Sequence, residues 1–135
     1  DLDLAADQSE KNPVYYLQYA HARICNIIKH GESKSISYQS NYNAKLLNHP
    51  AEIRLLKKLD QFPTIIENSL QTLEPQLIAN YLHDTANRFH KFYSECHVIT
   101  EDIDLSNARI ALVSATQTVL ANGLDLLGIS APDKM

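Results

Sequence analysis

Residues 12–30 read NPVYYLQYAHARICNIIKH and predict a long amphipathic helix. Asn12 is suited to cap the free amides of the first turn, and Pro13 suits the first helical position, where its fixed φ and missing N–H cost nothing. At about 100° per residue, one apolar stripe forms along the helix. The stripe consists of Val14, Leu17, Ala20, Ile24, Ile27 and Ile28. Gly31 follows the stretch and is expected to end the helix.

Further helices are predicted downstream, after a polar, aperiodic segment at residues 32–43 that reads as a loop. Pro50 and Pro75 each mark a helix start, because proline is tolerated in the first turn but not deeper. A shorter helix is expected at about 64–72, and the helix that begins near Pro75 is expected to reach about residue 98. The last helix is expected to run to about Asn122. Its expected cap is Ser106 or Asn107, its terminator Gly123, and its core stripe Leu105, Ala108, Leu112, Ala115 and Val119.

The fold class predicted from this pattern is all-α, a compact bundle of about five helices, because no long segment alternates as a strand does. A length of 135 residues with 44% hydrophobic residues is enough for one core. Residues 11–135 are interpreted as the helical domain. Residues 1–10 alternate acidic and apolar residues at their start and are interpreted as a linker or the tail of an upstream domain.

Charge and cysteine content narrow the function. The net charge is −4, but four of the sixteen acidic residues fall in the first ten, so the remainder balances at twelve acids and twelve bases. A neutral surface argues against nucleic-acid binding by bulk electrostatics alone, yet it permits binding through stacking and shape. Cys25 and Cys96 lack a Cys-x-x-Cys spacing, which favours reduced thiols and no metal site. With no signal peptide or membrane span, we expect a soluble, cytoplasmic protein.

Several motifs resemble those of one family. Residues 12–25, NPVYYLQYAHARIC, resemble the segment that opens the C-terminal DALR-type anticodon-binding domain of arginyl-tRNA synthetases. ARIALV at 108–113 and VLANGLDLLGI at 119–129, with the final Met135, are similar to the family's terminal helix and C-terminus. The end reads Asp-Lys-Met where the family usually has Glu-Arg-Met, which preserves the charge pattern. Residues 49–59 and 89–96 resemble the helices between.

The resemblance implies a domain that binds the anticodon loop of tRNA(Arg) and cooperates with an upstream catalytic domain of the same chain. The His-Ile-Gly-His and Lys-Met-Ser-Lys-Ser type signatures of class I synthetases are absent, so no catalytic residue is expected here. ATP and Mg²⁺ are expected only for a full-length ligase. DNA, a membrane and an oligomer are not implied. A stand-alone helical domain that docks partner helices along its tyrosine-rich flank is the alternative.

Candidate RNA contacts come from the first helix and from the resemblance. Tyr16, Tyr19 and Arg23 lie along one flank with Asn26, and aromatics beside a cation suit unpaired bases and phosphates. The same tyrosines are also compatible with a core border. The resemblance adds the aromatic at Tyr93, the side chain at His97 and the terminal Met135, and we expect Tyr93 and Met135 to meet at one surface.

Other polar residues are assigned structural roles. His21 falls inside the apolar stripe and is expected to be a hydrogen-bonded core histidine. Arg109 is expected to form an ion pair with an acidic residue of a neighbouring helix. His83, His90 and His97 recur every seven residues, a rise of about 10.5 Å, which is too long for shared ligation of one zinc ion.

Overall fold

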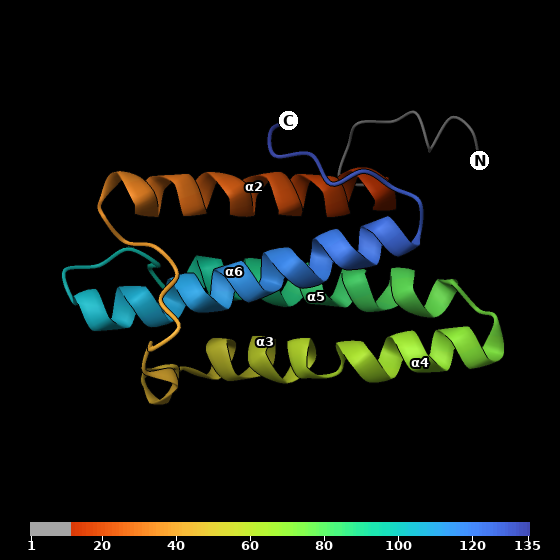
Figure 1. Ribbon diagram of the computed structural model, residues 1–135, viewed down its shortest axis with the longest axis horizontal. Coiled ribbons are helices and arrows are strands. Elements are labelled where there is room, and N and C mark those ends of the chain that lie inside the picture. The colour runs from red at the N-terminus through yellow and green to blue at the C-terminus, as the bar shows by residue number, and fades with distance from the viewer. Residues whose placement is uncertain (1–11) are drawn as a thin grey trace.

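The computed structural model describes residues 12–135, and every regular element in that range is helical (Figure 1). The elements are α2 (Pro13–Ser33), the short 3₁₀ helix η1 (Ala44–Leu46), α3 (Pro50–Asp60), α4 (Phe62–Thr72), α5 (Gln76–Glu95) and α6 (Ile103–Leu126). The all-α prediction is confirmed. The predicted linker or tail at residues 1–10 lies outside the described residues and stays a prediction.

The helices pack in layers, with α2 on one side of α5 and α6 and with α3 and α4 on the other (Figure 1). Since only Gln61 separates α3 from α4, these two run in line, and the helices of residues 12–135 occupy four positions in the bundle. Helix α5 is central, because it contacts α2, α3, α4 and α6. Within the described range, no helix combines the length and apolar character that a membrane span needs.

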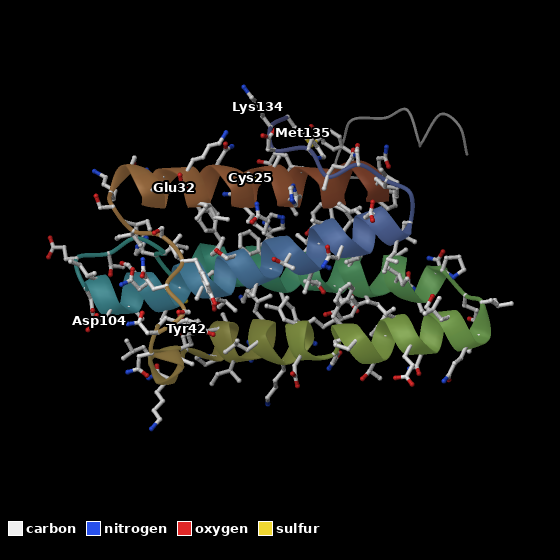
Figure 2. The ribbon with its side chains drawn as sticks, viewed as in Figure 1. Cys25, Glu32, Tyr42, Asp104, Lys134 and Met135 are labelled. Atoms are coloured by element: carbon white, nitrogen blue, oxygen red, sulfur yellow. The ribbon has the colours of Figure 1, made fainter. Side chains whose placement is uncertain are left out.

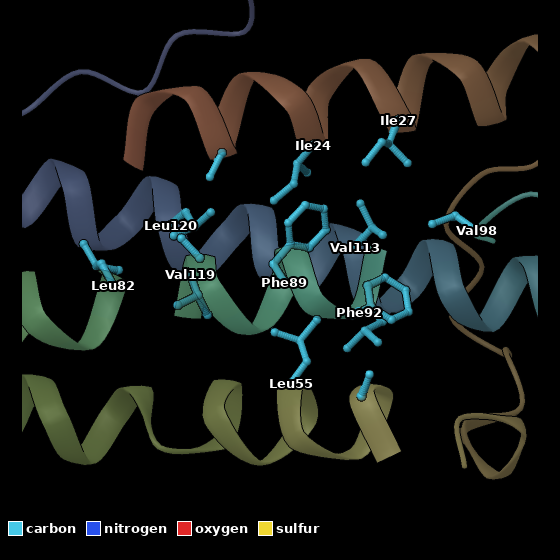
Figure 3. Close-up of a cluster of buried hydrophobic side chains, with 14 of the residues drawn as sticks. Ile24, Ile27, Leu55, Leu82, Phe89, Phe92, Val98, Val113, Val119 and Leu120 are labelled. Atoms are coloured by element: carbon cyan, nitrogen blue, oxygen red, sulfur yellow. The ribbon is translucent and has the colours of Figure 1, made fainter. Parts of the chain in front are cut away.

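The core is built around two aromatic rings of α5 (Figure 3). Phe89 and Phe92 are both completely buried, with ring centroids 6.2 Å apart. Ile24 of α2, Leu55 of α3 and Leu120 of α6 are buried in the same cluster. Truncating such a phenylalanine to alanine costs about 3–5 kcal/mol, so this cluster holds the helices together.

Two glycines predicted to end helices lie inside them, so both predictions are wrong. A Cβ at Gly31 would lie 2.8 Å from the carbonyl oxygen of Ile36, and one at Gly123 would lie 2.5 Å from Leu82 Cδ2. Both glycines therefore allow a neighbouring part of the protein to approach the helix more closely than a side chain would permit. Helix α6 is terminated by Gly128, whose φ of +73° favours glycine.

Other helix boundaries also differ from expectation. Asn12 caps α2 as predicted, accepting bonds from the amides of Val14 and Tyr15. The cap of α6 is Asp102, however, whose Oδ1 accepts from the amide of Leu105 at 3.2 Å. Ser106 is buried and accepts from the amide of Thr100 at 2.7 Å instead. Helix α6 thus begins one turn earlier than predicted, α4 begins two residues earlier, α5 ends at Glu95, and Ala115 of the predicted core stripe is exposed.

Candidate functional site

A groove of about 500 Å³ opens between the second half of α2 and the end of α5. Its walls are Arg23, Asn26, Ile27 and His30 from α2, with Tyr93 and residues 96–99 opposite. The α2 residues recur at helical spacing on one flank, which is why a single helix supplies four of them. The groove brings together three of the residues predicted from sequence: Arg23, Tyr93 and His97. We call it the Arg23–Tyr93 groove.

Arg23 and Tyr93 face one another across this groove. The guanidinium carbon of Arg23 lies 4.6 Å from the centroid of the Tyr93 ring, within the range of a cation–π contact. The Tyr93 ring also stacks on Phe89, with centroids 6.1 Å apart and planes inclined by 14°. Tyr93 is half-buried and belongs partly to the core border. Its ring is therefore held in a fixed orientation beside a cation.

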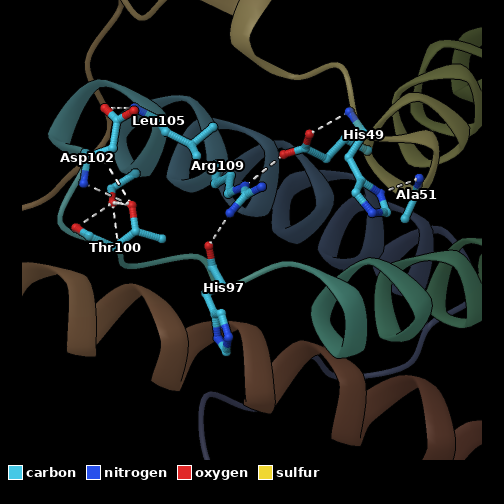
Figure 4. Close-up of polar contacts among 9 residues, drawn as sticks. His49, Ala51, His97, Thr100, Asp102, Leu105 and Arg109 are labelled. Carbon is cyan, nitrogen blue, oxygen red and sulfur yellow. Dashed lines mark hydrogen bonds and ion pairs between the residues drawn. The ribbon is translucent and has the colours of Figure 1, made fainter.

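His97 contributes in two ways to the same region (Figure 4). Its side chain is exposed and points toward α2, whereas its carbonyl oxygen accepts from Nη1 of Arg109 at 2.6 Å. The Nε of Arg109 donates to Oε2 of Glu52 at 2.8 Å, and Glu52 Oε1 accepts from the amide of His49 at 3.0 Å. The ion pair predicted for Arg109 is thus confirmed. It fixes the backbone that presents His97.

Cys96 forms part of the groove wall without adding a reactive group. Burial raises the pKa of its thiol, so the sulfur stays protonated at neutral pH and behaves as a small apolar side chain. Cys25 is buried as well, and both thiols are free, as the sequence predicted. The groove consequently joins apolar surface from Ile27 and Cys96 to polar groups at Arg23, Asn26 and His97.

Tyr16 and Tyr19 do not line the groove. Tyr16 donates from its hydroxyl to Oδ1 of Asn87, and its ring packs on His83 and His90 with centroids 5.0 and 5.5 Å away. It therefore bridges α2 and α5. Tyr19 is 42% exposed and stacks on Tyr15 at 6.4 Å. Of the two, Tyr19 offers a ring face to solvent, and both remain predictions as RNA contacts.

The three histidines spaced by seven residues lie in two environments, with His83 and His90 on α5 and His97 beyond its end. His83 and His90 contact Tyr16, whereas His97 lines the groove. Among residues 12–135, no group of three or more His, Cys, Asp or Glu side chains is arranged to hold a metal ion.

The C-terminal segment leaves α6 at Gly128 and crosses α2 (Figure 1). His21 is buried, and its Nδ1 lies 2.8 Å from the carbonyl oxygen of Pro132, which confirms the prediction of a hydrogen-bonded core histidine. Met135 is 55% exposed and lies beside α2 (Figure 2). Helix α6 packs on α5 as expected, and the turn at Gly128 carries the chain end to α2. The predicted meeting of Tyr93 and Met135 at one surface stays a prediction.

His30 and residues 98–99 belong to the groove but were not predicted to. The signal for His30 was available, because it lies seven residues after Arg23 and therefore on the same flank. No periodic signal marks residues 98–99, since they lie beyond the end of α5 and are placed by tertiary contacts.

The fold and groove define a class of protein: an all-α bundle whose surface groove pairs an aromatic ring with a cation. The family model described as DALR anticodon binding domain matches residues 17–135. The chain belongs to this family.

Arginine–tRNA ligases are among the known proteins similar to the chain. The chain is 47% identical over 135 residues to the arginine–tRNA ligase of Salinibacter ruber, covering 100% of the chain and 24% of the relative. It is 47% identical over 137 residues to that of Ruminiclostridium cellulolyticum, with the same coverage. Among solved structures, Thermus thermophilus arginyl-tRNA synthetase superposes with a TM-score of 0.77 at 31% identity, covering 89% of this chain and 21% of that one.

The chain therefore spans about a quarter of the length of the curated relatives it matches. These relatives confirm the resemblance read from the sequence motifs. They do not favour the alternative of a stand-alone protein-interaction domain, because the matching stretch forms part of a ligase in each relative.

Proposed function

We propose that this chain binds the anticodon loop of tRNA(Arg) through the Arg23–Tyr93 groove. Arg23 covers the Tyr93 ring and offers a charge for a phosphate. When Arg23 turns from the ring to a phosphate, the ring face that it covered becomes open for base stacking. Asn26 and His97 offer hydrogen-bonding groups at the rim. Tyr16, Tyr19 and Met135 are proposed as further RNA contacts beyond the groove.

The observation that carries this proposal is the stack of Phe89, Tyr93 and Arg23. Phe89 is completely buried and supports the Tyr93 ring, which is in turn covered by a guanidinium. Within residues 12–135 no carboxylate forms an ion pair with Arg23. An unneutralised cation on a preorganised aromatic ring suits a nucleotide, since base and phosphate are engaged together.

In a full-length ligase this domain would position tRNA(Arg) so that its acceptor end reaches a catalytic domain elsewhere in the chain. Aminoacylation, with its requirement for ATP and Mg²⁺, would then be carried out in the cytoplasm by residues outside this chain. The division of labour explains why a domain with no catalytic signature forms part of ligases.

Titration of the chain with tRNA(Arg) and with an unrelated tRNA tests the proposal. We expect binding of tRNA(Arg) that is weaker than that of a complete synthetase, because the upstream contacts are missing, and weaker binding still of the unrelated tRNA. Equal affinity for both tRNAs, or no binding of either, would contradict it. Mixing the chain with arginine, ATP and tRNA should give no aminoacylation above a heat-killed sample.

A further inference from the structure

Helix α2 presents two flanks with different tasks. Successive residues turn by about 100°, so His21 and Arg23 lie about 200° apart around the helix axis. Arg23 faces Tyr93 of α5. His21 and Gln18 lie on the opposite flank, where they contact the segment that follows α6.

Two side chains of α2 hold this C-terminal segment. Nε2 of Gln18 donates to the carbonyl oxygen of Ser130 at 3.0 Å and to its hydroxyl at 3.2 Å. Nδ1 of His21 lies 2.8 Å from the carbonyl oxygen of Pro132, a distance that requires the proton on Nδ1, because a carbonyl can only accept. Sγ of Cys25 lies 3.7 Å from the same His21 nitrogen and accepts a hydrogen bond from Nε2 of Gln117. Cys25 therefore links His21 to α6.

A buried alanine on the outer side of α2 supports the same picture. Ala22 points away from the core face that Ile24 occupies, yet it is only 3% exposed. The C-terminal segment crosses α2 on the side away from α5 and α6 (Figure 1). Gly128 makes the crossing possible. With Ile129 it forms a Schellman motif, in which Ile129 N–H donates to Leu124 and Gly128 N–H to Asp125.

We propose that Gln18 and His21 form a clamp that positions Met135 for contact with the anticodon loop. The inference rests on the proposed function, and it assigns His21 and Gln18 as positioning residues that do not themselves touch RNA. Asp133, Lys134 and Met135 are exposed and follow the last clamped residue, Pro132. The clamp thus leaves only this short end free.

The length of the free end determines how strongly the clamp raises the local concentration of Met135 at the RNA site. The spread of a flexible segment grows as the square root of its length, and the local concentration of its tip falls as about the −3/2 power of length. Ile129 and Ala131 also pack against the core. Release of the clamp therefore lengthens the free segment from three residues (133–135) to four (132–135) if this packing persists, and to seven (129–135) if it is lost as well. The local concentration of Met135 at the RNA site then falls about 1.5-fold in the first case and about fourfold in the second.

The test is a double-mutant cycle on the chain with the anticodon stem-loop of tRNA(Arg) as ligand. Gln18→Leu combined with His21→Leu removes the donors and adds no second methionine. His21→Asn is the matched control, because its amide nitrogen can replace Nδ1. We expect the double variant to bind the stem-loop about 1.5-fold to fourfold more weakly and His21→Asn to bind nearly as wild type. The double variant should add no further loss once Met135 is deleted.

Binding-independent support comes from methyl NMR, since Met135 is the single methionine of the chain. Its methyl signal should narrow in the double variant as the end becomes freer. Unchanged affinity in the double variant, or an equal loss with and without Met135, overturns the clamp. Full affinity after Met135 deletion overturns the clamp's role in RNA binding but leaves the groove function intact if Tyr93 variants still bind more weakly. If the wild-type chain does not bind the stem-loop, both the proposed function and the clamp's role in RNA binding are overturned.

Discussion

Arg23 and Arg109 both lie beside His97 and carry the same charge, but they are used in opposite ways. Arg109 is 13% exposed, donates to Glu52 and the carbonyl of His97, and has its charge neutralised inside the protein. Arg23 lies on Tyr93 at the groove and has no ion-pair partner within residues 12–135.

The difference separates an arginine that builds the site from one that is available to a ligand. A charged group with a buried partner contributes to the fold, because removing it leaves the partner unpaired. A cation stacked on an aromatic ring keeps much of its field directed outward. Substitutions in the two regions should therefore change different measurements.

The largest expected effect is on stability, for Arg109→Met. Glu52 is 1% exposed, so loss of Arg109 leaves a buried carboxylate without its charge partner. Such a loss costs about 3–5 kcal/mol. We expect the melting temperature to fall by roughly 10 °C or more for a chain of this size.

Arg109→Met combined with Glu52→Gln is the matched control, because the neutral amide can still accept from the amide of His49. Partial recovery of the melting temperature is expected in the double variant. A fall of less than about 3 °C for Arg109→Met would show that the pair is not structural.

The next effect is on RNA affinity, for Tyr93→Ala. Loss of a stacking ring costs about 1–3 kcal/mol per base, or roughly 5-fold to 150-fold in affinity for the tRNA(Arg) stem-loop. Because Tyr93 also packs on Phe89, alanine should lower the melting temperature as well. Tyr93→Leu keeps apolar contact with Phe89 and is the better test. A large fall in melting temperature, with normal RNA binding by the fraction that stays folded, would show that Tyr93 is a core residue and not an RNA contact.

His97→Ala should give a smaller change. Only the carbonyl of His97 bonds to Arg109, so the substitution keeps that contact, and the melting temperature should stay within about 2 °C. Loss of one side-chain hydrogen bond is worth about 0.5–1.5 kcal/mol, or roughly 2-fold to 10-fold in stem-loop affinity. Unchanged affinity at equal stability would remove His97 from the interface.

Part of this comparison could be read from the sequence. Helical periodicity identified the flank that holds Arg23, and the position of Arg109 toward an apolar stripe predicted its ion pair. The all-α class followed from the same periodicity, with the cap at Asn12 read correctly from local chemistry.

The remaining features depend on tertiary packing. Glycine permits both a helix end and a close approach, and sequence alone does not distinguish them, so Gly31 and Gly123 were misread. The partner of His21 is the carbonyl of Pro132, a backbone group 111 residues away that carries no residue-type signal. For the same reason, the sequence does not predict that the chain end crosses α2.

The smallest expected effect, in Arg23→Met, decides what Arg23 contacts. On single-stranded nucleic acid, each phosphate neutralised by a protein cation adds about 0.7 to the negative slope of log affinity against log salt concentration. If Arg23 meets one phosphate, its loss should flatten the slope by about 0.7, so that the affinity gap between variant and wild type shrinks about 2.6-fold from 50 to 200 mM salt. We expect this outcome, because Arg23 has no ion-pair partner within residues 12–135 and lies at an open groove. Tyr93→Leu, measured alongside, should weaken binding without changing the slope, since stacking releases no counterions. An unchanged slope in Arg23→Met, with weaker binding at every salt concentration, would assign Arg23 to a base or to the support of Tyr93 and would place the phosphate contact elsewhere.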